Sequence, residues 1–384
     1  MVYVNPNFGD PTIYWFLRLI LFSSLFVTGY YVTYLMKDIK KYWFAVTPVM
    51  VLYTLIEGLR YLRGWDYPHY MYDLTKGLWS SYSEPIYIMW ANAFRQLEIH
   101  FVYGFLFYSA ILAFGFFLLL RDFHKAAFWA CPLFLIIPDQ STNLIRMFFA
   151  MAFLLIGIHY LINKEKKAYV FFAISSMIHF SVIPVVFFAI FLNWARVGYL
   201  SNYVYVVLAV YLAFAFFWDV SSLDNIIPLL AMIDSSDFEQ GNAYLSNAEI
   251  WFGTAGNISE KYGFKSAGLI MTTLNICVPA YIIYYGNKAF RIYPRLKVLL
   301  GCSVIAFFVQ ILGGGIELFS RYYHWMTCLI PILIGMIWYI VPMKSVERML
   351  FIFLICFYYY IAKFIYYLFV PGAVMTGYGF IWDK

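Results

Sequence analysis

Charge is scarce in this chain of 384 residues, of which only 12% are Asp, Glu, Lys or Arg. Ordinary soluble domains carry about 25%. Hydrophobic residues make up 64% of the chain and aromatic residues 23%, a composition that excludes a soluble globular class. The net charge of +6 does not indicate a nucleic-acid partner, because the lysines and arginines stand in short runs between apolar segments. The sequence therefore predicts a polytopic membrane protein.

Cysteine is rare as well, and its five positions lie inside or beside apolar segments without Cys-x-x-Cys spacing. They are interpreted as small core residues, which excludes a disulfide framework or a cysteine metal site. The sequence has no Gly-rich phosphate loop, His-Glu-x-x-His or Gly-x-Ser-x-Gly motif. The first apolar run follows no basic n-region and has no small-residue cleavage site, so we expect a retained helix over Tyr14–Met36.

Long apolar runs are what the chain does have, and they predict an all-α polytopic transmembrane bundle of about 12 membrane helices, short half-spans included. We expect one transmembrane domain over residues 1–384. The runs are 14–36, 42–59, 100–120, 126–138, 143–162, 168–178, 181–193, 203–219, 266–286, 297–313, 322–342 and 349–370.

The basic loops predict the orientation, because Lys and Arg collect on the cytoplasmic side. All of them share that side only if the run over 168–193 is broken near His179 into two half-spans that form a hairpin. Each half reaches about 18 Å, less than the hydrocarbon core of about 30 Å. The extracytoplasmic segments are then the two termini and loops 60–99, 139–142, 220–265 and 314–321. Within loop 60–99, the segments 72–79 and 85–97 are amphipathic and predict short interfacial helices.

Ionisable residues gather in the first outer loop, directly after the second apolar run. Such groups are costly near hydrocarbon, by about 2.5–3.5 kcal/mol at its centre, and therefore indicate a functional site. The structural alternative is a snorkelling arginine pair, Arg60 and Arg63, that anchors a helix end. The cluster comprises Arg60, Arg63, Asp66, Tyr67, His69 and Tyr70.

Arg146 lies where a helix is expected to begin, after Pro138 and the hydroxyls of Ser141 and Thr142. A guanidinium beside free helix N–H groups predicts an anion site. The alternative is a structural arginine that pairs with Asp139 or Glu84.

His179 stands at the predicted hairpin tip, where non-helical backbone must face protein or water. Its alternative is a hydrogen-bonded core histidine.

The segment Glu317–His324 repeats this pattern at another outward-facing helix end, with Ser320 as the expected cap and Arg321 as a fourth arginine. The alternative is a Glu317–Arg321 ion pair that closes a loop. The acidic loop 220–265 has no regular metal-ligand spacing and predicts a solvated loop, so we expect no metal site.

Taken in order, these residues resemble the EpsG family of Wzy-type polysaccharide polymerases. The resemblance rests on Arg60, Asp66, Tyr67 and Tyr70, then Glu84-Pro85, then Asn143 and Arg146, then Ile178, His179 and Ser181, then Ser320-Arg321-Tyr322.

The resemblance implies a membrane glycosyltransferase of the C-type in the bacterial cytoplasmic (inner) membrane, with its active site facing outward. Its partners would be an undecaprenyl-diphosphate-linked oligosaccharide donor and acceptor, membrane lipid and, as a candidate, a chain-length regulator. The polymer would be an O-antigen, capsule or exopolysaccharide. No cofactor, metal or nucleic acid is implied.

Under this hypothesis the arginines Arg60, Arg63, Arg146 and Arg321 bind the diphosphate, because guanidinium groups stay charged and bind phosphate bidentately. His179 is the first candidate for the catalytic base, with Asp66 and Glu84 as alternatives. The expected glycan contacts are Tyr67, His69, Tyr70, Asn143, Glu317, Tyr322, Tyr323 and His324.

Two other classes remain open. A lipid-linked oligosaccharide flippase or other transporter also needs a cationic cavity and broken helices. Against it, the charged positions lie toward one membrane face only. An O-antigen ligase or a polyprenyl-monophosphate-sugar glycosyltransferase would share the outward site.

Overall fold

The computed structural model describes residues 11–61, 64, 66–78, 84–138, 141, 143–195, 202–218, 269–313, 317–365 and 379–380. The acidic loop 220–265 lies outside these residues. The described part is helical apart from two paired two-residue strands, β1 (Arg60–Tyr61) and β2 (Gly379–Phe380).

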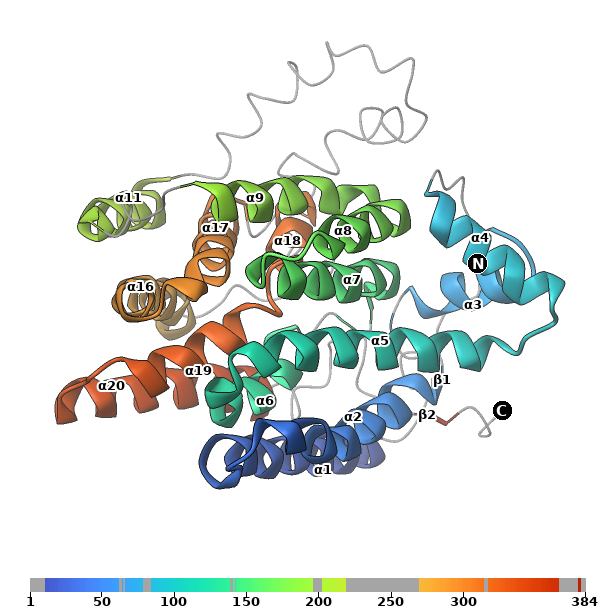
Figure 1. The fold of residues 1–384 in the computed structure, drawn as a ribbon, viewed down its shortest axis with the longest axis horizontal. Helices are drawn as coiled ribbons and strands as arrows, with labels where there is room; N and C mark the ends of the chain where they lie inside the picture. Colours follow the sequence, from blue (N-terminus) through green and yellow to red (C-terminus); the bar gives the residue numbers. More distant parts are fainter. Residues whose placement is uncertain are drawn as a thin grey trace, which may run out of the picture.

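The helices lie side by side in stacked layers, which run in Figure 1 from α1 and α2 through α5 to α7, α8 and α9. The first half comprises α1 (Pro11–Tyr30), α2 (Tyr42–Gly58), α5 (Phe101–Asp122), α6 (Ala127–Ile136), α7 (Ile145–Ile162), α8 (Lys167–Ile178) and α9 (Ile183–Trp194). The second half comprises α11 (Val204–Phe217), α16 (Leu269–Ile292), α17 (Lys297–Gly313), α18 (Glu317–His324), α19 (Ile330–Ile340), α20 (Ser345–Ile355) and the π-helix η9 (Cys356–Ile365). Two short helices, α3 (Tyr67–Thr75) and α4 (Pro85–Gln96), lie in the segment between α2 and α5, close to the two interfacial helices that the sequence predicts.

Five helical segments are long and apolar enough to cross a membrane, and five shorter apolar helices accompany them in the described part. The five long segments are Trp15–Leu35, Phe101–Asp122, Ile145–Ile162, Pro294–Gly313 and Ser345–Phe364. The protein is thus an all-α membrane protein, as predicted. The number of about 12 membrane helices remains a prediction.

Glycines mark the closest approaches between helices. A Cβ on Gly115 of α5 would lie 2.6 Å from the carbonyl oxygen of Ala152 in α7. A Cβ on Gly335 of α19 would lie 2.2 Å from the carbonyl oxygen of Ala126. Small residues bring backbones together in this way because membrane helices associate through van der Waals packing.

The basic loops meet at one end of the bundle. Lys125 donates to the carbonyl of Thr33, which joins the loop after α5 to the end of the first helix. The loops after α7 and α9 join the same end through the pairs Asp122–His159, Asn163–Arg295 and Ala195–Lys297. The end of α19 joins it through Lys125–Tyr339, and the start of α20 joins α19 there through Arg348–Trp338. This agrees with loops that share one membrane side.

The run over 168–193 is broken at the predicted place. α8 ends at Ile178, His179 is extended (φ −156°, ψ 107°), and a 3-10 turn, η5 (Phe180–Val182), leads into α9. α8 begins and α9 ends at the basic end, so the chain returns to the side from which it came. Both helices pack on α7, and α8 also packs on α4 whereas α9 packs mainly on α17. The two helices therefore make few contacts with each other, and the hairpin is held by its neighbours.

Three local predictions were wrong. The run 322–342 is two helices, because α18 ends at His324 and α19 starts again with Pro331 in its first turn, where the missing N–H costs nothing. Ser320 lies inside α18 and is not its cap. α7 starts at Ile145 without a side-chain cap.

Candidate functional site

The carboxylate of Glu84 joins two of the predicted site residues. Arg146 Nη1 donates to its Oε2 at 3.1 Å, and His179 Nδ1 lies 3.5 Å from its Oε1. Glu84 is 1% exposed, whereas the Arg146 and His179 side chains keep 13% and 12% of their surface accessible. The structure therefore contains the Arg146–Glu84 ion pair that the sequence left open, and it adds His179 to it.

Local structure explains how three distant segments supply this centre. Glu84 is extended and occupies the N-cap position of α4 without a side-chain cap bond, and Pro85 follows at the first helical position and fixes the helix start. Arg146 is the second residue of α7, so its guanidinium lies near free backbone N–H groups. His179 sits in the break between α8 and η5. Each residue thus lies at a helix end, where backbone and side chains can face a polar site.

Burial alone would raise the pKa of the Glu84 carboxyl, because a charge is poorly solvated there. The hydrogen bond from His179 and the charge of Arg146 outweigh that effect and lower the pKa from 4.5 to about 2. Glu84 therefore stays ionised at neutral pH and holds both partners in place.

A second buried carboxylate, that of Asp73, is linked to Arg146 through Tyr87. The Arg146 guanidinium lies 5.3 Å from the centroid of the Tyr87 ring, and the Tyr87 hydroxyl donates to Asp73 Oδ2 at 2.7 Å. Tyr87 and Asp73 are both fully buried. This pair was not predicted from the sequence, although Tyr87 follows Glu84 by three residues and so lies one turn along α4.

Ser181 and Trp325 hold the other side of His179. The Ser181 hydroxyl lies 3.4 Å from His179 Nδ1 and accepts a hydrogen bond from Trp325 Nε1 at 3.2 Å. The Trp325 ring meets the imidazole edge-on at 5.5 Å. Arg321, one turn before Trp325, lies close enough for its charge to act on His179. Contacts from α18 and from the residue after it thus complete the centre.

Arg60 belongs to a separate ion group. It is 3% exposed and donates to the Glu57 carbonyl, and its Nη1 lies 3.7 Å from Glu57 Oε2. Arg18 of α1 donates to Glu57 Oε1 at 3.1 Å. Arg60 is not on a helix, because α2 ends at Gly58 and Arg60 lies in β1. Arg63 lies outside the described residues.

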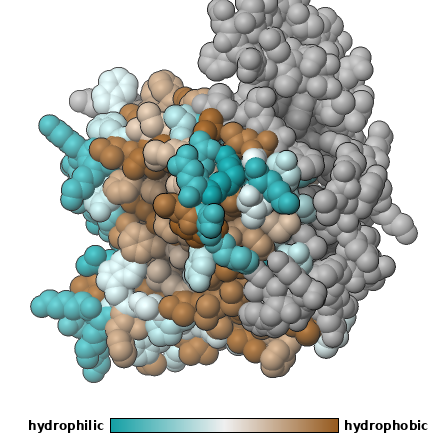
Figure 2. Space-filling model, turned by 90° about the vertical axis from the view of Figure 1, so that its right-hand side faces the viewer, coloured by the Kyte–Doolittle hydropathy of each residue, from teal (hydrophilic) through white to brown (hydrophobic). Residues whose placement is uncertain are grey.

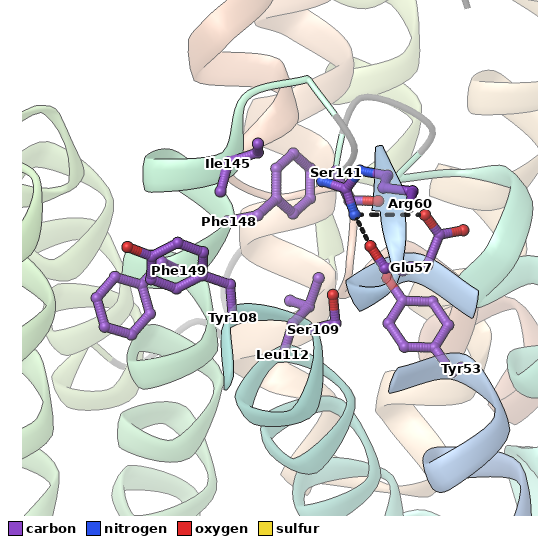
Figure 3. A pocket seen from close by; sticks show the side chains of 10 residues that line it. All are labelled: Tyr53, Glu57, Arg60, Tyr108, Ser109, Leu112, Ser141, Ile145, Phe148 and Phe149. Atoms are coloured by element: carbon purple, nitrogen blue, oxygen red, sulfur yellow. Dashed lines mark hydrogen bonds and ion pairs between the residues drawn. The ribbon is translucent and has the colours of Figure 1, made fainter. Parts of the chain in front are cut away.

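A small cavity adjoins this ion group, and Figure 3 shows Arg60 and Glu57 on one side of it with Tyr108 and Phe149 on the other. Its volume is about 10 Å³, roughly the space of one water molecule. A diphosphate does not fit there without movement.

The segment between α2 and α5 connects the two groups. Tyr67 donates its hydroxyl to the Arg60 carbonyl at 2.9 Å and stacks on Phe105 at 4.2 Å. The backbone N–H of Asp66 donates to Asn143 Oδ1 at 3.2 Å. Since Asn143 precedes Arg146 by three residues, the loop and the start of α7 are held together.

The other predicted glycan residues lie on α3 and α18. Tyr70 meets Tyr87 edge-on at 6.3 Å and so reaches the Arg146 side. His69 is on α3, and Tyr322, Tyr323 and His324 are on α18; the side chain of Glu317 lies outside the described residues. No group of three or more His, Cys, Asp or Glu side chains in the described part could hold a metal ion.

The structure defines an α-helical membrane protein with an arginine–glutamate–histidine centre. The end of the molecule that carries α3 and α4 is largely apolar, with hydrophilic side chains in a few patches (Figure 2). The model of the EpsG family matches residues 42–380, so the chain belongs to that family, which is associated with Wzy-type polymerases. No curated protein and no solved structure matches the chain.

Proposed function

We propose that this protein is a polysaccharide polymerase at the outer face of the bacterial cytoplasmic membrane. It would transfer an undecaprenyl-diphosphate-linked glycan onto a lipid-linked repeat unit. The observation that carries the proposal is the contact of Glu84 with both Arg146 and His179, with the charge of Arg321 acting on His179. This arrangement places cations next to a candidate base, the two groups that glycosyl transfer from a diphosphate needs.

In the reaction, an acceptor hydroxyl oxygen attacks the anomeric carbon of the donor sugar. The bond from that carbon to the diphosphate oxygen breaks, the hydroxyl proton goes to the base, and undecaprenyl diphosphate leaves with the bonding electrons. Arg146 and Arg321 stabilise the charge that develops on the diphosphate, usually the largest catalytic contribution. No nucleotide sugar and no metal ion is required, because the arginines supply the positive charge.

His179 is the base in this mechanism, and Glu84 positions it. Glu84 is held in an ion pair with Arg146, so it serves to position the base. Its contact with Nδ1 orients the imidazole and leaves Nε2 for the acceptor hydroxyl. Asp66 remains the alternative base.

The remaining predicted residues keep roles around this centre. Arg60 would bind the diphosphate only if it exchanged its Glu57 contacts for the ligand. Arg63 stays a predicted diphosphate ligand. The tyrosines of α3 and α18 offer ring faces for sugars.

The test is Arg146→Ala and Arg321→Ala in cells that depend on this protein for their polymer. Polymer is expected to fall at least about 100-fold while the protein still inserts, because each change removes transition-state charge stabilisation. Arg348→Ala is the matched control, since this arginine also lies over a ring, that of Trp338, but at the basic end. Unchanged polymer length and amount in the Arg146 and Arg321 variants would refute the leaving-group role.

A further inference from the structure

A continuous row of aromatic rings starts beside the arginine–glutamate–histidine centre. Each ring lies within 6.5 Å of the next, a spacing typical of favourable ring pairs. The centroid distances are 4.7 Å for Trp90–Phe107, 5.8 Å for Phe107–Phe149, 5.7 Å for Phe149–Phe153, 6.5 Å for Phe153–Phe171 and 5.3 Å for Phe171–Tyr160. We call these six residues the aromatic row.

The row extends from the site toward the basic end. Phe149 follows Arg146 by one turn of α7, and Trp90 lies on α4, the helix that begins after Glu84. The far end is marked by Lys167, whose Nζ lies 5.6 Å from the centroid of Tyr160. From Arg146 to Tyr160 the helix rises about 21 Å. The part of the row on α7, from Phe149 to Tyr160, rises about 16 Å, just over half of a hydrocarbon core of about 30 Å.

Most of the row is accessible from outside the bundle. Phe107 is 36% exposed, and Phe153, Phe171 and Tyr160 are partly exposed. Phe149 is only 2% exposed and forms the buried floor of the row. Figure 3 shows Phe149 beside Tyr108, across the small cavity from Tyr53 and Glu57. An apolar chain that lay along α7 would thus meet ring faces and reach Arg146 at its end.

We propose that the aromatic row binds the isoprenoid chain of the lipid-linked glycan, with the diphosphate at Arg146; this rests on the proposed function. The length of the row favours this occupant over an ordinary phospholipid, whose acyl chain ends near the membrane midplane. A long isoprenoid chain continues past the midplane, and its methyl and vinyl groups pack against ring faces. The row thereby fixes the direction in which the donor enters, between α5 and α8 and along α7.

Photo-crosslinking tests the location without any need for turnover. The full-length protein in lipid nanodiscs carries Phe107→p-benzoylphenylalanine and is irradiated with radiolabelled undecaprenyl diphosphate. Label is expected at this position, and unlabelled undecaprenyl diphosphate should compete it away whereas geranyl diphosphate should not. Phe353→p-benzoylphenylalanine is the control, because Phe353 is 58% exposed on α20 and also stacks on another ring, that of Phe357. Equal labelling at both positions, or label that does not compete, would overturn the proposal.

Kinetics give a second readout. The double variant Phe153→Leu/Phe171→Leu is expected to raise KM about tenfold for an undecaprenyl-linked donor and to leave KM unchanged for a geranyl-linked donor. Phe353→Leu/Phe357→Leu should change neither value. An equal effect on both donors would overturn the proposal. If label at Phe107 is competed away by unlabelled undecaprenyl diphosphate but the protein forms no polymer, the proposed function is refuted. The aromatic row would then still be a lipid-binding site.

Discussion

Glu84 is the residue on which the geometry of the centre depends. It is almost fully buried, and its two oxygens face different partners, Arg146 and His179. A buried carboxylate is stabilised only while such partners remain, because an unpaired charge is costly away from water. Loss of either partner should therefore disturb the other through Glu84.

His179→Ala should lower the transfer rate by about 100- to 10,000-fold, the usual contribution of a general base. The transfer rate is measured in a single turnover with purified protein. Folding of the variant is checked by its elution profile in size-exclusion chromatography. His124→Ala is the control, since His124 lies in the loop between α5 and α6 at the basic end. Full activity of the His179 variant would move the base to a carboxylate, with Asp66 next in line.

The Glu84 pKa predicts how stability depends on pH. A carboxyl whose pKa falls from 4.5 to about 2 on folding stabilises the folded state above pH 4.5, and this stabilisation is lost as pH falls through 2. The difference in apparent unfolding temperature between the wild type and Glu84→Gln should be constant from pH 7 to pH 5. It should shrink between about pH 4.5 and pH 2. A difference that already shrinks between pH 7 and pH 6 would contradict an ionised, paired Glu84.

At the scale of elements, the site is assembled from helix ends and from one broken helix. The break at His179 lets α8 and α9 enter and leave at the same end while their junction reaches Glu84. A straight helix over 168–193 would carry His179 past the site and bury its polar groups among apolar side chains. The break at His179 therefore belongs to the site as much as the site residues do.

The positions of most helices were predictable from the sequence, because a helix in a membrane needs a long run of apolar residues. The runs 42–59, 100–120 and 297–313 agree with α2, α5 and α17 to within two residues. The split of 322–342 was missed because the signal of Pro331, which lies in the first turn of α19, was overlooked. For the candidate site, the sequence offered Glu84 as one of two possible partners of Arg146, but it did not link His179 to that pair, since the three residues come from segments joined only by tertiary packing. Asp73 and Glu57 were missed for the same reason.

Close helix packing predicts unequal effects of adding one methyl group. Gly335→Ala should destabilise the fold by about 1–3 kcal/mol, because the new Cβ would overlap the Ala126 carbonyl. Gly77→Ala is the matched control: its Cβ would meet only Tyr72, at 4.0 Å, and should change stability by less than about 0.5 kcal/mol. The two variants are compared by thermal unfolding in the same detergent. Equal unfolding temperatures would contradict close packing between α19 and the start of α6.

The two ends of the helix bundle carry different groups. The basic loops share one end, and the arginine–glutamate–histidine centre lies at the opposite ends of α7 and α8. The helix α7 links the two, with Arg146 in its first turn and His159 in its last. An enzyme that works on one membrane face needs this asymmetry, whereas a transporter must expose its binding site to both faces in turn.

The most direct test of a polymerase supplies the purified protein with a defined undecaprenyl-diphosphate-linked repeat unit and separates the products by size. We predict a ladder of products that forms equally with a chelator present and disappears in the Arg146→Ala and His179→Ala variants. A single addition would indicate a ligase or simple transferase, and loss of products on chelation would reject metal-free transfer. Movement of the lipid-linked glycan across the membrane without any product would contradict the account and indicate a flippase.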